Sequence, residues 1–453
     1  MPIFSNRTLD LKRIKAIGFD MDYTIVRYHS EQSEQMTYKE VLKKLVLQKG
    51  YPKAIENLKF DYKRAIKGLV IDRKNGNLLK LSLYGKIKMA FHGTKPLEYK
   101  AQLKTYQGMY VDLNDPNYEV VDTSFSIAYG VLFAQLVDIK DSKKTIKLPA
   151  YEVMESDILE MVDLSHRDGS LKRKIAENIE KYIIQDPECV QVLERLRSDG
   201  KILMLITNSD FYYTKLLMEH TINPFLKKYK HWTELFNFTI TSSSKPRFFT
   251  DKLSFLKVDP KTGLMSNFDG KLTEGVYQGG SAKNLQTALG LTGEDILYLG
   301  DHIYGDIVTL KKACNWRTAL VIEELDKEIE CIKKSQKTQE ILDFMMEEKS
   351  KLEDALDEIN LKTKIEKKDK EQIGQLITKI ETLNARVSAH IQKFKKYFNP
   401  HWGEIMRAGN EESRYAGQVE KYACIYMAKI SDFSQYSSKR YFRPVKRLLP
   451  HEV

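Results

Sequence analysis

The chain reads Ile17-Gly18-Phe19-Asp20-Met21-Asp22-Tyr23-Thr24 at the point that decides its fold. The apolar run over residues 14–19 is typical of a buried strand, and two carboxylates follow it directly. Ligands of open α/β sheets bind just beyond the carboxyl ends of strands. We therefore expect Asp20 and Asp22 to project into a crevice, where one attacks and the other moves protons or helps to hold a metal. Two solvated aspartates in a turn are the alternative.

A second predicted strand, residues 201–206, ends in Thr207-Asn208-Ser209-Asp210. A helix is predicted to follow, so hydroxyl and amide groups would meet a helix N-terminus, which is suited to an oxyanion or a phosphate. Plain capping of that helix by Ser209 or Asp210 explains the same residues.

A lysine that could neutralise a phosphoryl oxygen has two candidates. Lys245 follows a third predicted strand, residues 236–240, whereas Lys283 begins the helix that precedes the last strand. The local sequence does not choose between them.

The last predicted strand, residues 295–299, ends in Gly300-Asp301-His302-Ile303-Tyr304-Gly305-Asp306. Two carboxylates in a loop at a strand end suit Mg²⁺, which usually takes one or two carboxylates and leaves room for a substrate phosphate. Solvated aspartates in a turn are again the alternative.

Composition limits the classes of protein that need to be considered. The chain has 453 residues, of which 42% are hydrophobic, so it is long enough for two or three domains. A net charge of +11 favours nucleic acid, an anionic membrane surface or small anions as partners, or serves only solubility. The four cysteines form no C-x-x-C pair, which argues against a disulfide scaffold or a zinc site. Without a signal peptide or a long apolar run, we expect a soluble cytoplasmic protein.

Residues 31–182 do not repeat the pattern of a strand followed by a carboxylate, and they read as an inserted cap. Apolar spacing predicts a helix in residues 37–49, short strands at 69–71, 78–83 and 87–91, and helices at 126–137 and 153–163. A polar turn from His166 to Lys172 leads into a helix predicted over 170–181, with Ser170 as its cap.

Residues 323–398 contain no proline and one glycine, with apolar residues at three- and four-residue steps. We predict two long amphipathic helices with a reversal near residues 367–370. The pair is either an arm for a partner or an oligomer, or a cover for the core. The aromatic residues of the tail predict that it is packed.

Each strand end is a weak signal, but the series resembles the haloacid dehalogenase (HAD) superfamily of phosphoryl-transfer enzymes. Several stretches resemble the cytosolic purine 5′-nucleotidases more closely. They are residues 19–24, 166–172, 207–210, 245–249, 300–307, 316–318, 399–403 and 449–452.

The resemblance implies an α/β fold: a three-layer Rossmann-like core with a parallel sheet, an inserted cap and a long C-terminal helical hairpin. The implied parts are core residues 1–30 and 183–323, cap residues 31–182, hairpin residues 324–398, and a tail, 399–453, that packs on the core or on a second subunit.

The resemblance also implies roles for the residues at the strand ends. Asp20 matches the nucleophile that forms an aspartyl-phosphate, and Asp22 matches the general acid and base. Lys245 matches the phosphate lysine. The matched phosphate-binding loop consists of Thr207, Asn208 and Ser209. Mg²⁺ would bind Asp20, the backbone carbonyl of Asp22, Asp301 and Asp306.

For the nucleotide's base and sugar, the matched positions are Phe125, Asp163, His166 and Lys172. Phe125 would stack on the purine, and Lys172 would lie near the phosphate. This sequence departs from the family at Ser126, where the family has asparagine, and at Leu159, where it has a base-contacting arginine. Lys312 and Gln418 match positions near a purine-nucleotide effector site.

The activity implied is an Mg²⁺-dependent 5′-nucleotidase for IMP and GMP that also transfers phosphate to nucleosides. The implied protein is activated by purine nucleotides and forms a homo-oligomer, a dimer or a tetramer. No membrane or nucleic acid partner is expected. The alternatives are a HAD phosphatase for another phosphorylated metabolite, and a scaffold that uses its basic surface and hairpin for binding.

Overall fold

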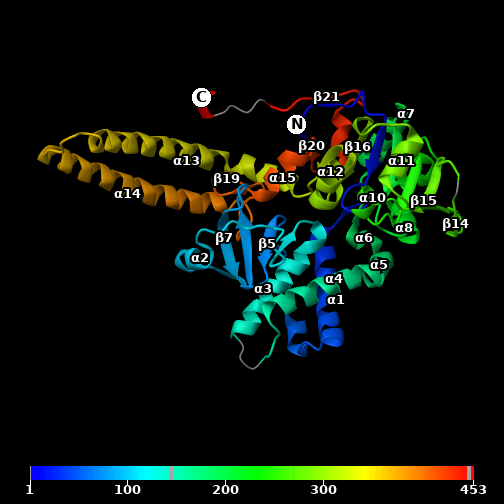
Figure 1. Cartoon of the computed structure of the whole chain (residues 1–453), viewed down its shortest axis with the longest axis horizontal. Helices are drawn as coiled ribbons and strands as arrows, with labels where there is room; N and C mark the ends of the chain where they lie inside the picture. Colours follow the sequence, from blue (N-terminus) through cyan, green and yellow to red (C-terminus); the bar gives the residue numbers. More distant parts are fainter. Residues whose placement is uncertain (1, 143–145, 269, 446–449, 453) are drawn as a thin grey trace. The chain divides into compact units, whose positions relative to one another are not determined.

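The computed structural model describes residues 2–142, 146–268, 270–445 and 450–452 (Figure 1). It divides into two compact units, one comprising Met1–Glu323 and Ile405–Val453 and the other Glu324–Glu404. Within the described residues, no helix has the length and apolar character needed to cross a membrane.

A mixed, largely parallel sheet forms the centre of the larger unit. Its strands lie in the order β1 (Ile3–Ser5), β20 (Ile425–Met427), β17 (Arg317–Val321), β16 (Ile296–Gly300), β3 (Ala16–Phe19), β11 (Ile202–Ile206), β12 (Phe238–Thr241), β15 (Gly275–Gly279), β13 (Phe255–Val258) and β14 (Met265–Asn267). Strands β20 to β15 in this order run parallel, and β1, β13 and β14 add antiparallel edges.

The four strands that the sequence marks with polar ends are neighbours, in the order β16, β3, β11, β12. The register pairs Phe19 with Leu205 on one side and with Leu299 on the other. Because these strands are parallel and in register, their polar ends meet at one edge of the sheet.

Both faces of this sheet are covered, which gives three layers. Alternate residues of a strand point to opposite faces. Accordingly, Ile17, Leu203 and Leu297 belong to one apolar cluster, and Ala16, Met204 and Tyr298 belong to another. The first cluster includes side chains of α7 (Pro187–Ser198) and α8 (Phe211–Thr221), and the second those of α10 (Arg247–Thr250), α11 (Ala282–Leu289) and α12 (Thr309–Cys314). The predicted fold class is confirmed.

The insert carries its own antiparallel sheet. Its strand order is β8 (Lys95–Pro96), β7 (Ile87–His92), β6 (Asn77–Leu81), β5 (Leu69–Asp72) and β9 (Tyr118–Val121). Its helices are α1 (Ser30–Lys49), α2 (Tyr99–Tyr106), α3 (Ile127–Ser142), α4 (Tyr151–Arg167), α5 (Ser170–Glu177) and α6 (Ile179–Tyr182). The chain enters through β4 (Arg27–Tyr28) and returns through β10 (Ile183–Ile184), and these two strands pair antiparallel.

The prediction of a single helix over residues 170–181 is wrong in two details. It breaks at Asn178 into α5 and α6. Ser170 is not its cap, because Gly169 precedes the helix with a φ of 76° and Ser170 is the first helical residue. The Ser170 backbone N–H instead donates to Asp168 Oδ1 at 2.8 Å.

The tail contributes to the core rather than only covering it. Strand β20 pairs with β17 in the central sheet, and β21 (Tyr441–Phe442) pairs with β2 (Leu9–Asp10). Helix α15 (Arg414–Tyr422) lies between β19 (Glu411–Glu412) and β20 in the chain. Residues 399–404, which the sequence grouped with the tail, belong instead to the second unit.

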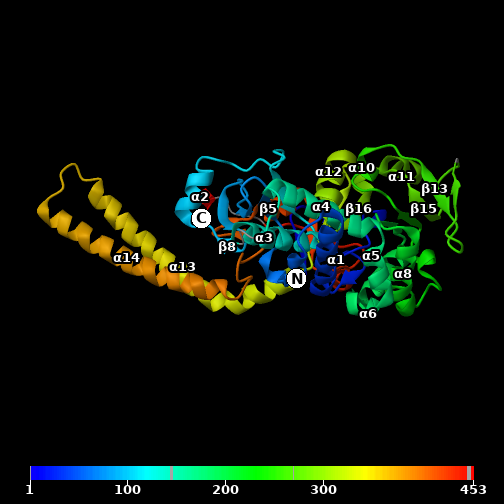
Figure 2. The same ribbon diagram turned by 90° about the horizontal axis from the view of Figure 1, so that it is seen from below.

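The second unit is a pair of long helices, α13 (Leu325–Asn360) and α14 (Lys367–Lys395), which lie side by side (Figure 2). Leu342, Met345, Leu383 and Val387 form their apolar seam. The reversal lies at residues 361–366, before the predicted position, because a capping box of Glu366 and Asp369 begins α14.

Glu34 on α1 is a buried carboxyl that meets the start of α3. Its Oε2 accepts a hydrogen bond from the Ala128 backbone N–H at 2.6 Å, and the side chain is 1% exposed. Carboxylates are favoured at helix N-termini. Burial nevertheless raises the pKa of Glu34 from 4.5 to about 8, so the folded protein favours the neutral carboxyl.

Replacing Glu34 by glutamine is expected to change how stability depends on pH. Above pH 4.5 the unfolded chain releases a proton that the folded protein retains up to about pH 8, so wild-type stability falls over this range. The free energy of unfolding of Glu34→Gln relative to wild type should therefore rise by up to about 1.4 kcal/mol per pH unit as the pH increases. Urea denaturation between pH 5 and pH 8 measures this slope. The exposed Glu31→Gln on the same helix is the control, and an equal slope in both variants would contradict the prediction.

Candidate active site

Asp20 lies directly beyond β3 and contacts a buried lysine. Lys245 Nζ is 2.7 Å from Asp20 Oδ1 and 2.9 Å from Asp306 Oδ1, and its side chain is only 5% exposed. The Met21 backbone N–H also donates to Asp20 Oδ1 at 2.7 Å. The first, third and fourth marked strand ends therefore meet in one ionic cluster.

Asp301 completes a group of three carboxylates. One oxygen each of Asp20, Asp301 and Asp306 lies within 4.8 Å of the others, and all three side chains are buried. Among the described residues, Asp301 Oδ2 has no hydrogen-bond partner. Gly300 is required here, since a Cβ at this position would lie 2.4 Å from Asp306 Oδ2.

The charge state of this group calls for a further cation. Burial raises the pKa of Asp20 to about 8 against the opposing effect of Lys245, and it raises the pKa of Asp301 well above its usual range. Lys245 contacts Asp20 and Asp306, and the charge of Lys67 opposes the rise in the pKa of Asp301 without cancelling it. Hard oxygen ligands with an unpartnered carboxylate oxygen fit Mg²⁺. The residues present therefore match the expected metal.

Asp22 is held separately from the three carboxylates. Its Oδ1 accepts a hydrogen bond from Tyr28 Oη at 2.5 Å, and its Oδ2 accepts one from Ser209 Oγ at 2.9 Å. Tyr28 Oη also lies 3.1 Å from Tyr213 Oη. Burial raises the pKa of Asp22, while the Tyr28 and Ser209 hydroxyls lower it. This carboxyl is therefore positioned at both oxygens and inclined to hold a proton.

The side chains of the loop after β11 form hydrogen bonds mainly with other residues of the protein. Asn208 Oδ1 accepts from the Lys245 backbone N–H at 2.6 Å, and its Nδ2 donates to the Lys245 carbonyl at 3.0 Å. Thr207 Oγ1 accepts from the Ser209 N–H at 3.0 Å. Asn208 thus fixes the loop that carries Lys245, and Ser209 fixes Asp22. Phosphate binding by this loop stays a prediction.

Asp210 is the cap that the sequence offered as an alternative, because its Oδ1 accepts from the Tyr213 N–H at 2.9 Å at the start of α8. It also joins the insert to the core. Lys172 Nζ on α5 is 2.6 Å from Asp210 Oδ2 and 5.3 Å from the centre of the Tyr213 ring. The lysine expected at the phosphate end therefore reaches the loop after β11.

An aromatic group lies next to Asp22. The Phe125 ring contacts the Tyr23 ring edge-on, with ring centres 4.6 Å apart. It also contacts the His166 ring edge-on, with ring centres 5.1 Å apart. Tyr23 also stacks on Tyr28. Burial lowers the pKa of His166 to about 4, so its ring is neutral near pH 7. Its Nε2 is buried and has no hydrogen-bond partner among the described residues.

The other expected residues lie outside this cluster. Asp163 is exposed on α4, one turn before His166. Lys283 is exposed on α11, so the structure brings Lys245, and not Lys283, to Asp20. Lys312 lies on α12 with its Nζ 5.8 Å from the Tyr422 ring centre, and Gln418 lies one turn before Tyr422 on α15.

Tyrosines are the site residues that sequence reasoning missed. The Tyr28 hydroxyl contacts Asp22, and the Tyr213 hydroxyl contacts that of Tyr28. Tyr298 Oη accepts from Lys245 Nζ at 3.0 Å. The available signal was a tyrosine inside a buried strand, β16, because a buried hydroxyl requires a partner. Tyr23 adopts a φ of 56°, a strained conformation that is concentrated at functional sites.

Removing the Tyr28 hydroxyl tests its hold on Asp22. In Tyr28→Phe, the carboxylate loses a charge-assisted donor, so the pKa of Asp22 should rise. The limb of the pH profile of kcat/KM that reports this acid should move to higher pH, and kcat should fall by about tenfold. Tyr212→Phe, on the same helix as Tyr213 but exposed, serves as the control. An unchanged profile would show that Tyr28 does not act through Asp22.

Comparisons with known proteins identify similar sequences. The model of the 5′ nucleotidase family matches residues 3–453. A 5′-nucleotidase domain-containing protein of Dictyostelium discoideum is 28% identical over 460 residues, which cover 99% of this chain and 74% of that protein. The 5′-nucleotidase domain-containing protein 2 of Rattus norvegicus is 27% identical over 471 residues, which cover 100% of this chain and 80% of that protein.

Solved structures add little. A beta-phosphoglucomutase from Clostridium difficile matches 69% of this chain and 86% of its own, at 11% identity and a TM-score of 0.26. A similarity this low carries no argument about the site.

Proposed function

Since this chain belongs to the 5′-nucleotidase family and is therefore a phosphoric monoester hydrolase, we propose that it hydrolyses purine nucleoside 5′-monophosphates through a phosphorylated Asp20. The observation that carries the proposal is the contact of Lys245 with both Asp20 and Asp306, while Asp22 is held apart by two hydroxyls.

Two parts of the site divide the work. Asp20 attacks phosphorus, and the ammonium of Lys245 offsets charge on the phosphoryl oxygens. Bound Mg²⁺, held by Asp20, Asp301, Asp306 and the carbonyl of Asp22, would neutralise phosphate charge that otherwise repels a carboxylate. Asp22 gives its proton to the leaving O5′, and as a carboxylate it then takes one from the incoming water.

The insert supplies the groups that recognise the nucleoside. Phe125 offers a ring to the base, and the unpartnered Nε2 of His166 offers a polar contact. Lys172, placed against Asp210, lies toward the phosphate end. Leu159 on α4 lacks the hydrogen-bonding groups of the family's arginine, so base recognition rests on fewer polar contacts.

The test is a panel of phosphate esters assayed for phosphate release. GMP and IMP should be hydrolysed faster than pyrimidine nucleotides or sugar phosphates, EDTA should stop the reaction, and Mg²⁺ should restore it. Repeating the panel with ATP or GTP tests activation, and adding a nucleoside acceptor tests phosphotransfer. Equal turnover of sugar phosphates would favour a phosphatase for another metabolite, and no turnover of GMP or IMP would refute the proposal.

Several finer expectations stay predictions. They are an effector site near Lys312 and Gln418, a homo-oligomer of two or four chains, and a cytoplasmic location. Sedimentation of the full chain, with and without GTP, measures the oligomer and any effect of the nucleotide on it.

A further inference from the structure

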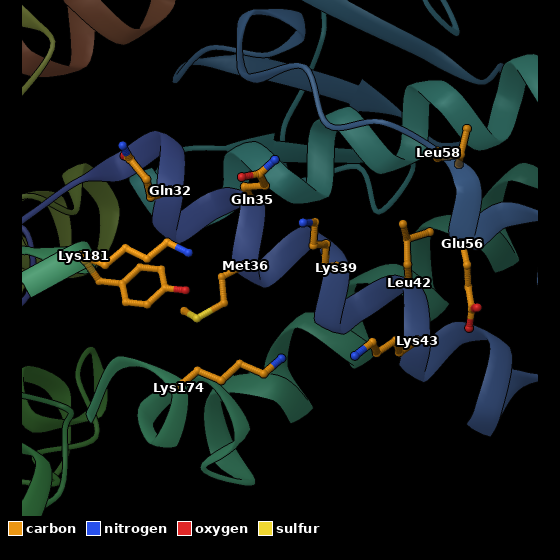
Figure 3. A pocket seen from close by; sticks show the side chains of 11 residues that line it. Gln32, Gln35, Met36, Lys39, Leu42, Lys43, Glu56, Leu58, Lys174 and Lys181 are labelled. Atoms are coloured by element: carbon orange, nitrogen blue, oxygen red, sulfur yellow. The ribbon is translucent and has the colours of Figure 1, made fainter. Parts of the chain in front are cut away.

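A cavity in the insert lies outside the site described above. It has a volume of about 410 Å³ and is bounded by α1, the turn η1 (Lys53–Asn57) with the residue after it, and α5 and α6 (Figure 3). This volume lies within the range of small-molecule sites. None of its lining residues belongs to the cluster around Asp20 or to the aromatic group around Phe125.

The charge of the lining is strongly positive. Four lysines, Lys39, Lys43, Lys174 and Lys181, face one acidic residue, Glu56. Lys174 forms an ion pair with Glu40. Within the part of the chain that the structure describes, the other three lysines form no ion pair. Figure 3 shows amines from α1, α5 and α6 around one opening, which concentrates positive charge.

The remaining lining suits a ligand with an apolar body. Met36, Leu42 and Tyr182 are buried and form part of the wall, and the amides of Gln32 and Gln35 add neutral donors. The lining holds no arginine, so its charged contacts to an anion would be made by lysine, which binds phosphate as a point charge. The excess charge calls for more than one phosphate group.

We propose that this cavity binds a small molecule that carries at least two phosphate groups. Such a ligand would contact Lys39 and Lys43, which lie one turn apart on α1, together with Lys174 and Lys181 across the opening. It would join α1 to α5, the helix that also carries Lys172. Occupation of the cavity should therefore reduce local opening in both helices.

Inorganic pyrophosphate is the probe, titrated calorimetrically into the full chain in EDTA at fixed ionic strength. The double variant Lys39→Ala/Lys43→Ala should bind it at least about tenfold more weakly, since two charge-assisted contacts are lost. The matched control is Lys100→Ala/Lys104→Ala, which removes two exposed lysines with the same spacing from α2 in the same insert. Sulfate should bind much more weakly than pyrophosphate, and added salt should weaken binding.

Hydrogen exchange locates the bound probe. Pyrophosphate should protect residues 32–43 and 170–182 in wild type and in the α2 control, but not in the α1 variant. Protection confined to the loops that follow Phe19, Ile206 and Thr241 would assign the binding to the catalytic cluster and overturn the proposal. No binding, equal binding of sulfate, or equal affinity of the α1 variant would also overturn it. These results do not depend on turnover, so they are independent of the nucleotidase assay.

Discussion

Asp20→Asn is expected to abolish phosphate release from GMP, with kcat reduced on the order of 10⁴-fold or more, because the amide cannot form the phosphorylated intermediate. The change preserves shape, and Asn Oδ1 can still accept the Met21 N–H bond. It also removes one of three crowded buried carboxylates. Lys245 loses Asp20 as a partner but keeps Asp306 at 2.9 Å, so we expect a thermal midpoint close to that of wild type in the absence of metal.

Rapid quench with ³²P-labelled substrate separates this role from a purely structural one. Wild type should accumulate acid-stable label on protein, and Asp20→Asn should not. Asp199→Asn, an exposed aspartate after α7, is the control and should keep full activity. Retained turnover in Asp20→Asn would remove Asp20 as the nucleophile.

Lys245→Ala should have the second largest effect, a loss on the order of 10³-fold in kcat/KM, because the phosphoryl group loses its ammonium partner. Asp20 and Asp306 also lose their common cation. Breaking a buried ion pair costs roughly 3–5 kcal/mol, so the variant should unfold at lower urea concentration without metal. Added Mg²⁺ should recover part of that stability.

Lys283→Ala is the matched control, because the sequence offered Lys283 for the same role and its side chain is exposed on α11. Its activity should stay within about twofold of wild type, because surface substitutions away from a site have small effects. If Lys283→Ala lost activity and Lys245→Ala kept it, the assignment of the phosphate lysine would be reversed.

The strands and the family could be predicted from the sequence because the residue patterns that indicate them are local. A buried strand followed by a carboxylate can be recognised within about eight residues of sequence, and this pattern identified the ends of β3 and β16. The strand boundaries shifted by one or two residues, whereas α1 begins at Ser30 rather than at residue 37 and α3 ends at Ser142 rather than at residue 137. The break at Asn178 was also missed, because helix ends depend on capping contacts. The resemblance to 5′-nucleotidases is confirmed at the level of the family.

The partners of the site residues were not accessible in the same way. Asn208 and Ser209 fitted a phosphate loop, yet their side chains bind the Lys245 backbone and Asp22. No local pattern records such contacts, because they require β11 to lie between β3 and β12. The tyrosines Tyr28 and Tyr298 escaped notice for the same reason.

The sequence by itself therefore determined the order along the chain of the strands and their polar ends, the inserted segment and the two long helices, since hydrophobic period and strand-end chemistry are properties of neighbouring residues. The local sequence left Lys245 and Lys283 open and the resemblance favoured Lys245, and the tertiary structure places Lys245 next to Asp20. Only the tertiary structure decided that Tyr28 and Ser209 hold Asp22 apart. The physical reason is that parallel strands pair across long stretches of chain, and their order and register fix which side chains come within hydrogen-bonding distance.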